Sequence, residues 1–167
     1  KAIGRKRDRS GLRSGYLLRI NQRFGQCQGH RKVLHRGAHI FEEIAFGLEN
    51  IGVPREEMKS RVEDAMALTG IRDLAERSPY SLSGGQQQRV AVARALATHP
   101  KLILADEPTA NLDTENGKQV MDIMQRLNKE TGVTFVFATH DPRVIGYANR
   151  VITLEDGLIV KDNGMSK

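Results

Sequence analysis

The stretch "SLSGGQQQRVAVARALATHPKLILADEP", residues 81–108, places a helix-like segment directly before an apolar strand. Ser83 is a good helix N-cap, and Gln86 lies three residues on, which is the spacing of a capping box. Apolar residues then recur at helical spacing, so we predict a helix over 84–98. The run "KLILAD" has the length of a buried strand. A helix that leads into a buried strand is typical of an α/β fold.

Two glycines open this helix, and capping does not explain them. Gly84 and Gly85 lie in the first turn, where glycine lowers helix stability. Bare backbone at a helix N-terminus lets an anion approach the unpaired N–H groups and the positive end of the helix dipole. We therefore expect an anion site here, and we expect Gly85→Ala to leave the single chain folded.

The segments after residue 108 continue the alternation of helix and strand. We predict a helix at 114–131 ended by Gly132, a second buried strand at 133–139, a short helix at 142–148 and a hairpin at 150–162. Asp156 and Gly157 form the expected hairpin turn. This order predicts an α/β domain with a mainly parallel sheet.

Residues 41–80 have a different pattern, which is helical throughout. A first helix is expected at 41–52 and a second at 54–70, with Pro54 at its start and Gly70 at its end. One or two further helical turns follow at 71–79. We interpret 41–80 as a helical subdomain beside an α/β core at 81–167.

The first forty residues are strongly basic. They hold eleven Lys or Arg and one acid, whereas residues 41–167 hold fifteen basic and nineteen acidic residues. Such an arm can bind phosphate backbones or acidic lipid, or it can be a poorly folded or foreign segment. We favour the second interpretation, with at most a short strand at 16–20.

The composition excludes several classes of protein. No apolar stretch reaches the length of a membrane-spanning helix, and the N-terminal residues lack the apolar core of a secretory signal. Cys27 is the only cysteine, so no internal disulfide can form. One thiol and five scattered histidines indicate no structural zinc site.

Chemically capable side chains follow both predicted core strands. Asp106 and Glu107 end the first strand, and His140 ends the second. Ligands of open α/β sheets bind beyond the carboxyl ends of strands. Asp113 follows the acidic pair, where it also suits the N-cap of the next helix. An exposed acid or a lone histidine at a strand end is often inert, so each signal is weak alone.

Taken in order, these segments resemble the ATP-binding-cassette (ABC) ATPases. "LSGGQQQR" resembles their signature motif, "LILADE" their Walker B strand, "ANLD" their D-loop and "ATHD" their switch loop. The resemblance spans residues 41–162. It implies a P-loop NTPase-like, mainly parallel sheet with an all-helical subdomain, and it implies ATP and Mg²⁺ as ligands.

The resemblance also implies roles for the glycine-marked stretch. Ser83, Gly84, Gly85 and Gln86 would contact the γ-phosphate of a nucleotide held mainly by a second subunit. Asp113 would link the two sites across a two-fold dimer.

Three further roles follow from the same resemblance. Asp106 would hold Mg²⁺ through water. Glu107 would orient and deprotonate the attacking water. His140 would hydrogen-bond the γ-phosphate, so that the site acts by positioning and charge stabilisation.

The phosphate-binding loop of this family is absent from the sequence. No G-x-x-x-x-G-K-[ST] pattern occurs in it. The family's glutamine loop has three candidates, Gln22, Gln26 and Gln28, none of them in the expected strand context. We therefore expect the chain alone to show negligible ATP hydrolysis.

The resemblance implies the ATPase subunit of a transporter, which would be cytoplasmic and peripheral on the inner face of the cell membrane. It would act as a homodimer with transmembrane transporter subunits. One alternative is a non-catalytic interaction module, and another is a nucleic-acid protein, against which the net acidic cassette portion argues. Residues 106–113 and 138–160 resemble lipoprotein-release and macrolide-export ATPases, whereas 42–58 resembles energy-coupling importers. We favour export on the longer match.

Overall fold

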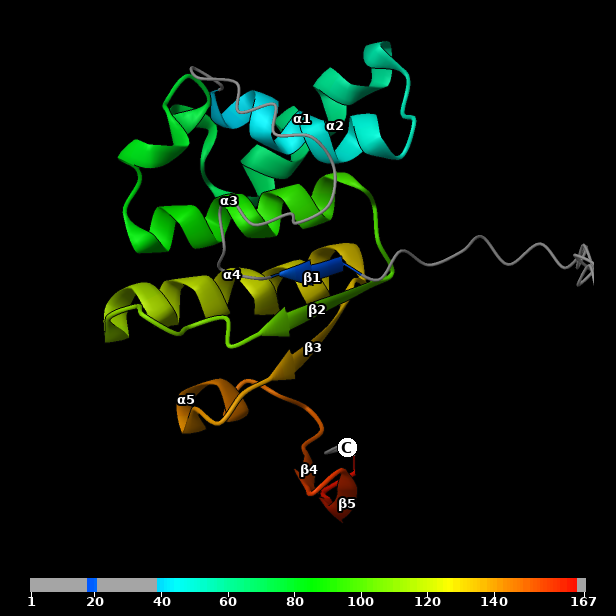
Figure 1. Cartoon of the computed structure of the whole chain (residues 1–167), viewed down its shortest axis with the longest axis vertical. Helices are drawn as coiled ribbons and strands as arrows, with labels where there is room; N and C mark the ends of the chain where they lie inside the picture. Colours follow the sequence, from blue (N-terminus) through cyan, green and yellow to red (C-terminus); the bar gives the residue numbers. More distant parts are fainter. Residues whose placement is uncertain (1–17, 21–38, 165–167) are drawn as a thin grey trace, which may run out of the picture.

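The computed structural model describes residues 18–20 and 39–164 of the chain. Figure 1 shows α1 and α2 as one layer, then α3 and α4, with a small sheet against α4. The order along the chain is β1 Leu18–Ile20, α1 Ile40–Asn50, α2 Arg55–Thr69, two 3₁₀ turns Arg72–Leu74 and Pro79–Ser81, α3 Gly84–Ala97, β2 Leu102–Asp106, α4 Thr114–Thr131, β3 Thr134–Ala138, α5 Pro142–Ile145, β4 Ile152–Glu155 and β5 Leu158–Asp162. The fold is α/β, as predicted.

Two helices form the region that the sequence predicts to be helical. α2 ends at Gly70, which adopts the left-handed conformation (φ +67°) that terminates helices. Pro54 occupies the N-cap of α2, one position before the helix begins. A helical turn is present in the predicted stretch 71–79 as the 3₁₀ turn Arg72–Leu74, and irregular backbone follows it before Pro79.

The glycine-marked helix α3 is capped as predicted. The Gln86 amide donates to Ser83 Oγ (3.3 Å), and the Ser83 amide donates to Gln86 Oε1 (3.0 Å). α3 packs against α1 and α2 and also against α4. It therefore buries more than the single apolar face that the periodicity predicts, and its buried apolar side chains are Val90, Ala91, Val92, Ala93, Ala95, Leu96 and Ala97. Arg94 Nη1 donates to Glu43 Oε1 of α1 (2.9 Å).

The three strands β1, β2 and β3 form one parallel sheet, with β2 in the centre. The short strand expected at 16–20 is confirmed as β1, although it lies in the basic segment. Ile103 of β2 is fully buried and lies beside Phe135 of β3. On the opposite face, Val136 of β3 is 47% exposed. The helices thus cover one face of β2 and β3 more fully than the other.

Asp113 caps α4 as predicted, since its Oδ1 accepts from the Asn116 amide (2.8 Å). Gly132 (φ +71°) ends the helix. The apolar face of α4 faces the core with the side chains of Val120, Met121, Met124 and Leu127.

The C-terminal hairpin forms around the predicted turn. Asp156 and Gly157 both have positive φ, which a two-residue hairpin turn requires. However, β4 and β5 form a separate antiparallel sheet and do not extend the parallel one. The hairpin lies at the far end of the molecule from α1 and α2 (Figure 1). Its large apolar side chains are exposed, namely Ile152, Leu154, Leu158, Ile159 and Val160.

Candidate functional site

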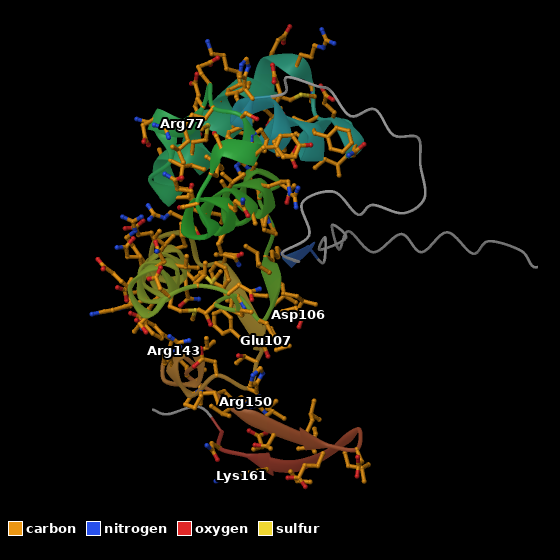
Figure 2. The ribbon with its side chains drawn as sticks, turned by 60° about the vertical axis from the view of Figure 1, so that its left-hand side comes forward. Arg77, Asp106, Glu107, Arg143, Arg150 and Lys161 are labelled. Carbon is orange, nitrogen blue, oxygen red and sulfur yellow. The ribbon has the colours of Figure 1, made fainter. Side chains whose placement is uncertain are left out.

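The carboxyl ends of β2 and β3 lie together, because the strands are parallel and paired in register up to Asp106 and Ala138. The Glu107 amide donates to Ala138 O (2.9 Å), which extends this pairing by one residue. Figure 2 shows Asp106 and Glu107 where β2 ends. The structure thus brings the predicted acidic pair to the strand that leads to His140.

Glu107 is held by two residues that follow β3. Its Oε2 accepts from Thr139 Oγ1 (3.0 Å), and its Oε1 lies 2.7 Å from His140 Nδ1. The His140 amide also donates to Oε1 (3.2 Å). The His140 side chain is 93% exposed, so it meets Glu107 from the solvent side. The two predicted catalytic residues are therefore in direct contact.

The backbone of Glu107 is unusual for a residue with a side chain. Its φ is +47°, in the left-handed region that costs most L-residues energy. The turn directs the chain away from β2 and presents the carboxylate to Thr139 and His140. Strained backbone of this kind clusters at functional sites.

A second network supports the turn after His140. Asp141 caps α5 and accepts from Thr109 Oγ1 (3.1 Å). Hydrogen bonds from Arg143, its side chain first, lower the pKa of Asp141 to about 2. The Asp141 carboxylate therefore stays charged at neutral pH. It fixes the loop that carries His140 to the loop after Glu107.

The start of α3 forms a second group with the loop before α4. Ser83 and Gln86 are engaged with each other in the capping box. Asp113 accepts from both the backbone and the side chain of Asn116 (2.8 and 2.6 Å), and these bonds hold its pKa below the usual value. Asn116 in turn lies against Gly85.

This packing corrects the explanation of the glycine pair. A Cβ on Gly85 would lie 2.5 Å from Asn116 Oδ1, and one on Gly84 would lie 3.2 Å from Leu112 Cδ2. A side chain at position 85 would therefore force Asn116 to shift, whether or not an anion binds there. The contact adds a stability cost to Gly85→Ala, and the expectation that the single chain still folds stays a prediction.

We expect Gly85→Ala to lower the free energy of unfolding by about 1–3 kcal/mol, the usual range for overpacking a well-packed site. Thermal unfolding would show the loss. Gly117→Ala is the matched control, because a Cβ there meets Thr109 at an ordinary 3.6 Å. Equal melting temperatures for the two variants would contradict the assignment.

Two cavities lie in the described part of the chain, and neither is lined by Asp106, Glu107 or His140. The first, of about 590 Å³, lies at the C-terminal ends of α2 and α3 and is lined by residues that include Leu68, Leu96 and His99. Another, of about 220 Å³, lies between α4 and α5 beside Thr109 and Tyr147.

Sequence reasoning missed Thr139 and Asn116. The sequence carried a signal for each. Thr139 directly precedes the predicted His140, and Asn116 stands three residues after the predicted N-cap Asp113. The candidate glutamines Gln22, Gln26 and Gln28 lie outside the described residues, as does Cys27.

The family comparison gives the class of protein. The model of the ABC transporter family matches residues 12–110, which is more than half of the chain. The chain belongs to this family, and its fold is that of the P-loop ABC ATPase domain. The matched range begins at residue 12, so the family match includes part of the basic segment and not only residues after 40.

Individual relatives give the closer likeness. The chain is 40% identical over 152 residues to the methionine import ATP-binding protein of Carboxydothermus hydrogenoformans, covering 90% of this chain and 45% of that protein. It is 48% identical over 126 residues to an energy-coupling factor transporter ATP-binding protein of Ligilactobacillus salivarius, covering 75% and 45%. The solved cbiO1 structure from Clostridium perfringens, part of the ABC transporter complex cbiONQ, superposes with a TM-score of 0.73 at 30% identity, covering 87% of this chain and 55% of that one.

The chain therefore spans about half the length of the relatives that it matches. Among the helices of residues 39–164, none is both long and apolar enough to cross a membrane.

Proposed function

We propose that this chain carries the hydrolytic and signature part of an ATPase that drives an ABC transporter. The observation that carries the proposal is the contact of Glu107 with Thr139 and His140 at the end of β2. A carboxylate fixed by hydrogen bonds, next to a second acid, suits a general base that orients water beside a metal-bound phosphate.

Each residue would have a defined task in this reaction. Glu107 would accept a proton from water, and His140 would leave Glu107 to donate a hydrogen bond to the γ-phosphate. Ser83, Gly84, Gly85 and Gln86 would contact the γ-phosphate of the partner subunit's nucleotide, with the unpaired N–H groups of α3 as donors. Asp113 would contact the second subunit.

The residues present fit Mg²⁺ bound together with a nucleotide. Among the described residues, no group of three or more His, Cys, Asp or Glu could hold a metal ion alone. Mg²⁺ needs no such cage, because one or two carboxylates with water and phosphate oxygens complete its shell. Asp106, half-buried at the end of β2, would supply that carboxylate. The ion would neutralise charge on the phosphates.

The partners and the location follow from the family. We propose a homodimer of cassettes bound to transmembrane transporter subunits, at the inner face of the cell membrane, without nucleic acid. We also propose the division into a basic segment at 1–40, a helical subdomain at 41–80 and an α/β core at 81–167. β1 pairs with β2, so part of the basic segment contributes to the core sheet.

The direction of transport has two candidates. The methionine relative is an importer by name, and the energy-coupling relative is of the class that residues 42–58 resemble. These two relatives favour import as the direction of transport. The resemblance of residues 106–113 and 138–160 to export ATPases keeps export as the second candidate.

We expect the purified chain to show negligible ATP hydrolysis and weak ATP binding, since its sequence has no G-x-x-x-x-G-K-[ST] loop to hold the phosphates. Phosphate release and equilibrium dialysis with Mg²⁺ would measure both. A chimera that adds the phosphate-loop half of an energy-coupling relative should hydrolyse ATP. Failure of a folded, ATP-binding chimera to do so would contradict the proposed function.

A further inference from the structure

The start of α3 is in direct contact with the segment that begins α4. A Cβ on Gly85 would lie 2.5 Å from Asn116 Oδ1, 3.0 Å from its Cγ and 3.2 Å from its Cβ. Real Cβ atoms essentially never approach within 3.0 Å. Only the bare backbone of a glycine accommodates Asn116 at this position.

Asn116 cannot move freely away from Gly85, because Asp113 holds it. Its Nδ2 donates to Asp113 Oδ2 (2.6 Å), and its amide donates to Asp113 Oδ1 (2.8 Å). Hydrogen bonds to a carboxylate are about twice as strong as neutral ones. One side chain thus contacts Gly85 by packing and Asp113 by a charge-assisted hydrogen bond.

Two further contacts join α3 to α4 and to the loop that precedes α4. Leu112 Cδ2 lies 3.2 Å from the Cβ position of Gly84. Farther along the two helices, Arg89 Nη2 donates to Gln119 Oε1 (2.8 Å). α3 and α4 run as neighbours in Figure 1. Asn116 alone among these contacts bonds the Asp113 carboxylate.

We propose that Asn116 is a positioning residue that joins Asp113 to Gly85, so that the dimer-contact loop and the phosphate-facing start of α3 move as one unit. The functional meaning of the two ends rests on the proposed function. The coupling itself lies within one chain. A second subunit that displaces Asp113 would therefore displace the glycine pair of the same chain.

Hydrogen exchange on the full chain without nucleotide tests this coupling. We expect Asp113→Ala to speed exchange of the Gln87, Gln88 and Arg89 amides by about fivefold, since loss of such a cap releases Asn116. In the Asn116→Ala background, Asp113→Ala should leave these amides unchanged. Equal acceleration with and without Asn116 would overturn the proposal.

A double-mutant cycle tests the packing half of the inference. Asn116→Ala removes the two nearest atoms from Gly85, so it should abolish most of the melting-temperature loss caused by Gly85→Ala. Asn116→Asp keeps the shape but cannot donate to Asp113. Two carboxylates then face each other and the side chain at 116 can move aside, so part of the Gly85→Ala loss should disappear and the exchange rates should rise.

Matched controls separate coupling from general loosening. Gln119→Ala breaks the Arg89 contact and should not alter the response of the α3 amides to Asp113→Ala. The midpoint of the Asp113 carboxyl titration should rise in Asn116→Ala, because this variant loses the side-chain hydrogen bond that helps to lower the pKa. An unchanged midpoint would overturn the proposal. None of these measurements uses ATP. They therefore test the coupling within the chain even if the proposed ATPase function is wrong.

Discussion

Glu107→Gln should lower ATP hydrolysis by about 10²- to 10⁴-fold in the chimera that carries a phosphate-binding loop, the range expected for loss of a general base. The amide has the same shape as the carboxylate and still accepts a hydrogen bond from Thr139, so the local fold should persist. It cannot take a proton from water. ATP binding and ATP-dependent dimer formation should remain, because Asp106 and the start of α3 are untouched.

Phosphate release and size-exclusion chromatography with ATP measure the two parts of this result. Glu130→Gln is the matched control, since it makes the same chemical change on an exposed residue of α4. Its rate should equal that of the unmodified chimera. A near-normal rate for Glu107→Gln would place the base elsewhere. Loss of ATP binding in Glu107→Gln would instead show that Glu107 holds the nucleotide or its metal.

Ile103→Ala should lower the free energy of unfolding by about 2–5 kcal/mol, the range for truncating a fully buried isoleucine. Ile103 is 0% exposed in the central strand, on the face that the helices cover. The cavity left by three deleted carbons cannot close easily between β1 and β3. Thermal unfolding should show a fall of about 5–15 °C in the melting temperature.

Leu104→Ala provides the matched control on the same strand. Leu104 points to the opposite face, is only half-buried and lies beside the exposed Val136. Leu104→Ala should lower the free energy of unfolding clearly less than Ile103→Ala does. Equal losses would contradict the assignment of the core to one face of the sheet.

Local signals predicted most elements and their ends. Ser83 with Gln86 and Asp113 with Asn116 are caps whose partners stand three residues away, so the spacing alone determines them. Gly70 and Gly132 end helices because glycine adopts positive φ without steric cost. The apolar runs of β2 and β3 are equally local. The sequence also placed Asp106, Glu107 and His140 at strand ends, as found.

Contacts between distant segments could not be predicted in this way. From the sequence, Gly84 and Gly85 suggested only an anion site. The tertiary structure adds a second reason for glycine, because Leu112 and Asn116 pack where a side chain would lie. The sequence predicted a helical turn after residue 70 but not that it would be the 3₁₀ turn Arg72–Leu74. The hairpin β4–β5 formed its own sheet, while β1 joined β2 across more than eighty positions.

The sequence by itself therefore determined the helices, the strands and the residue types at their ends, because hydrophobic period and capping act over a few positions. Only the tertiary structure decided that Glu107 meets Thr139 and His140, and that Asn116 meets Gly85. The physical reason is that these contacts depend on strand register and helix packing. Both are set by the burial of side chains from the whole chain, such as Ile44, Ile103 and Leu127.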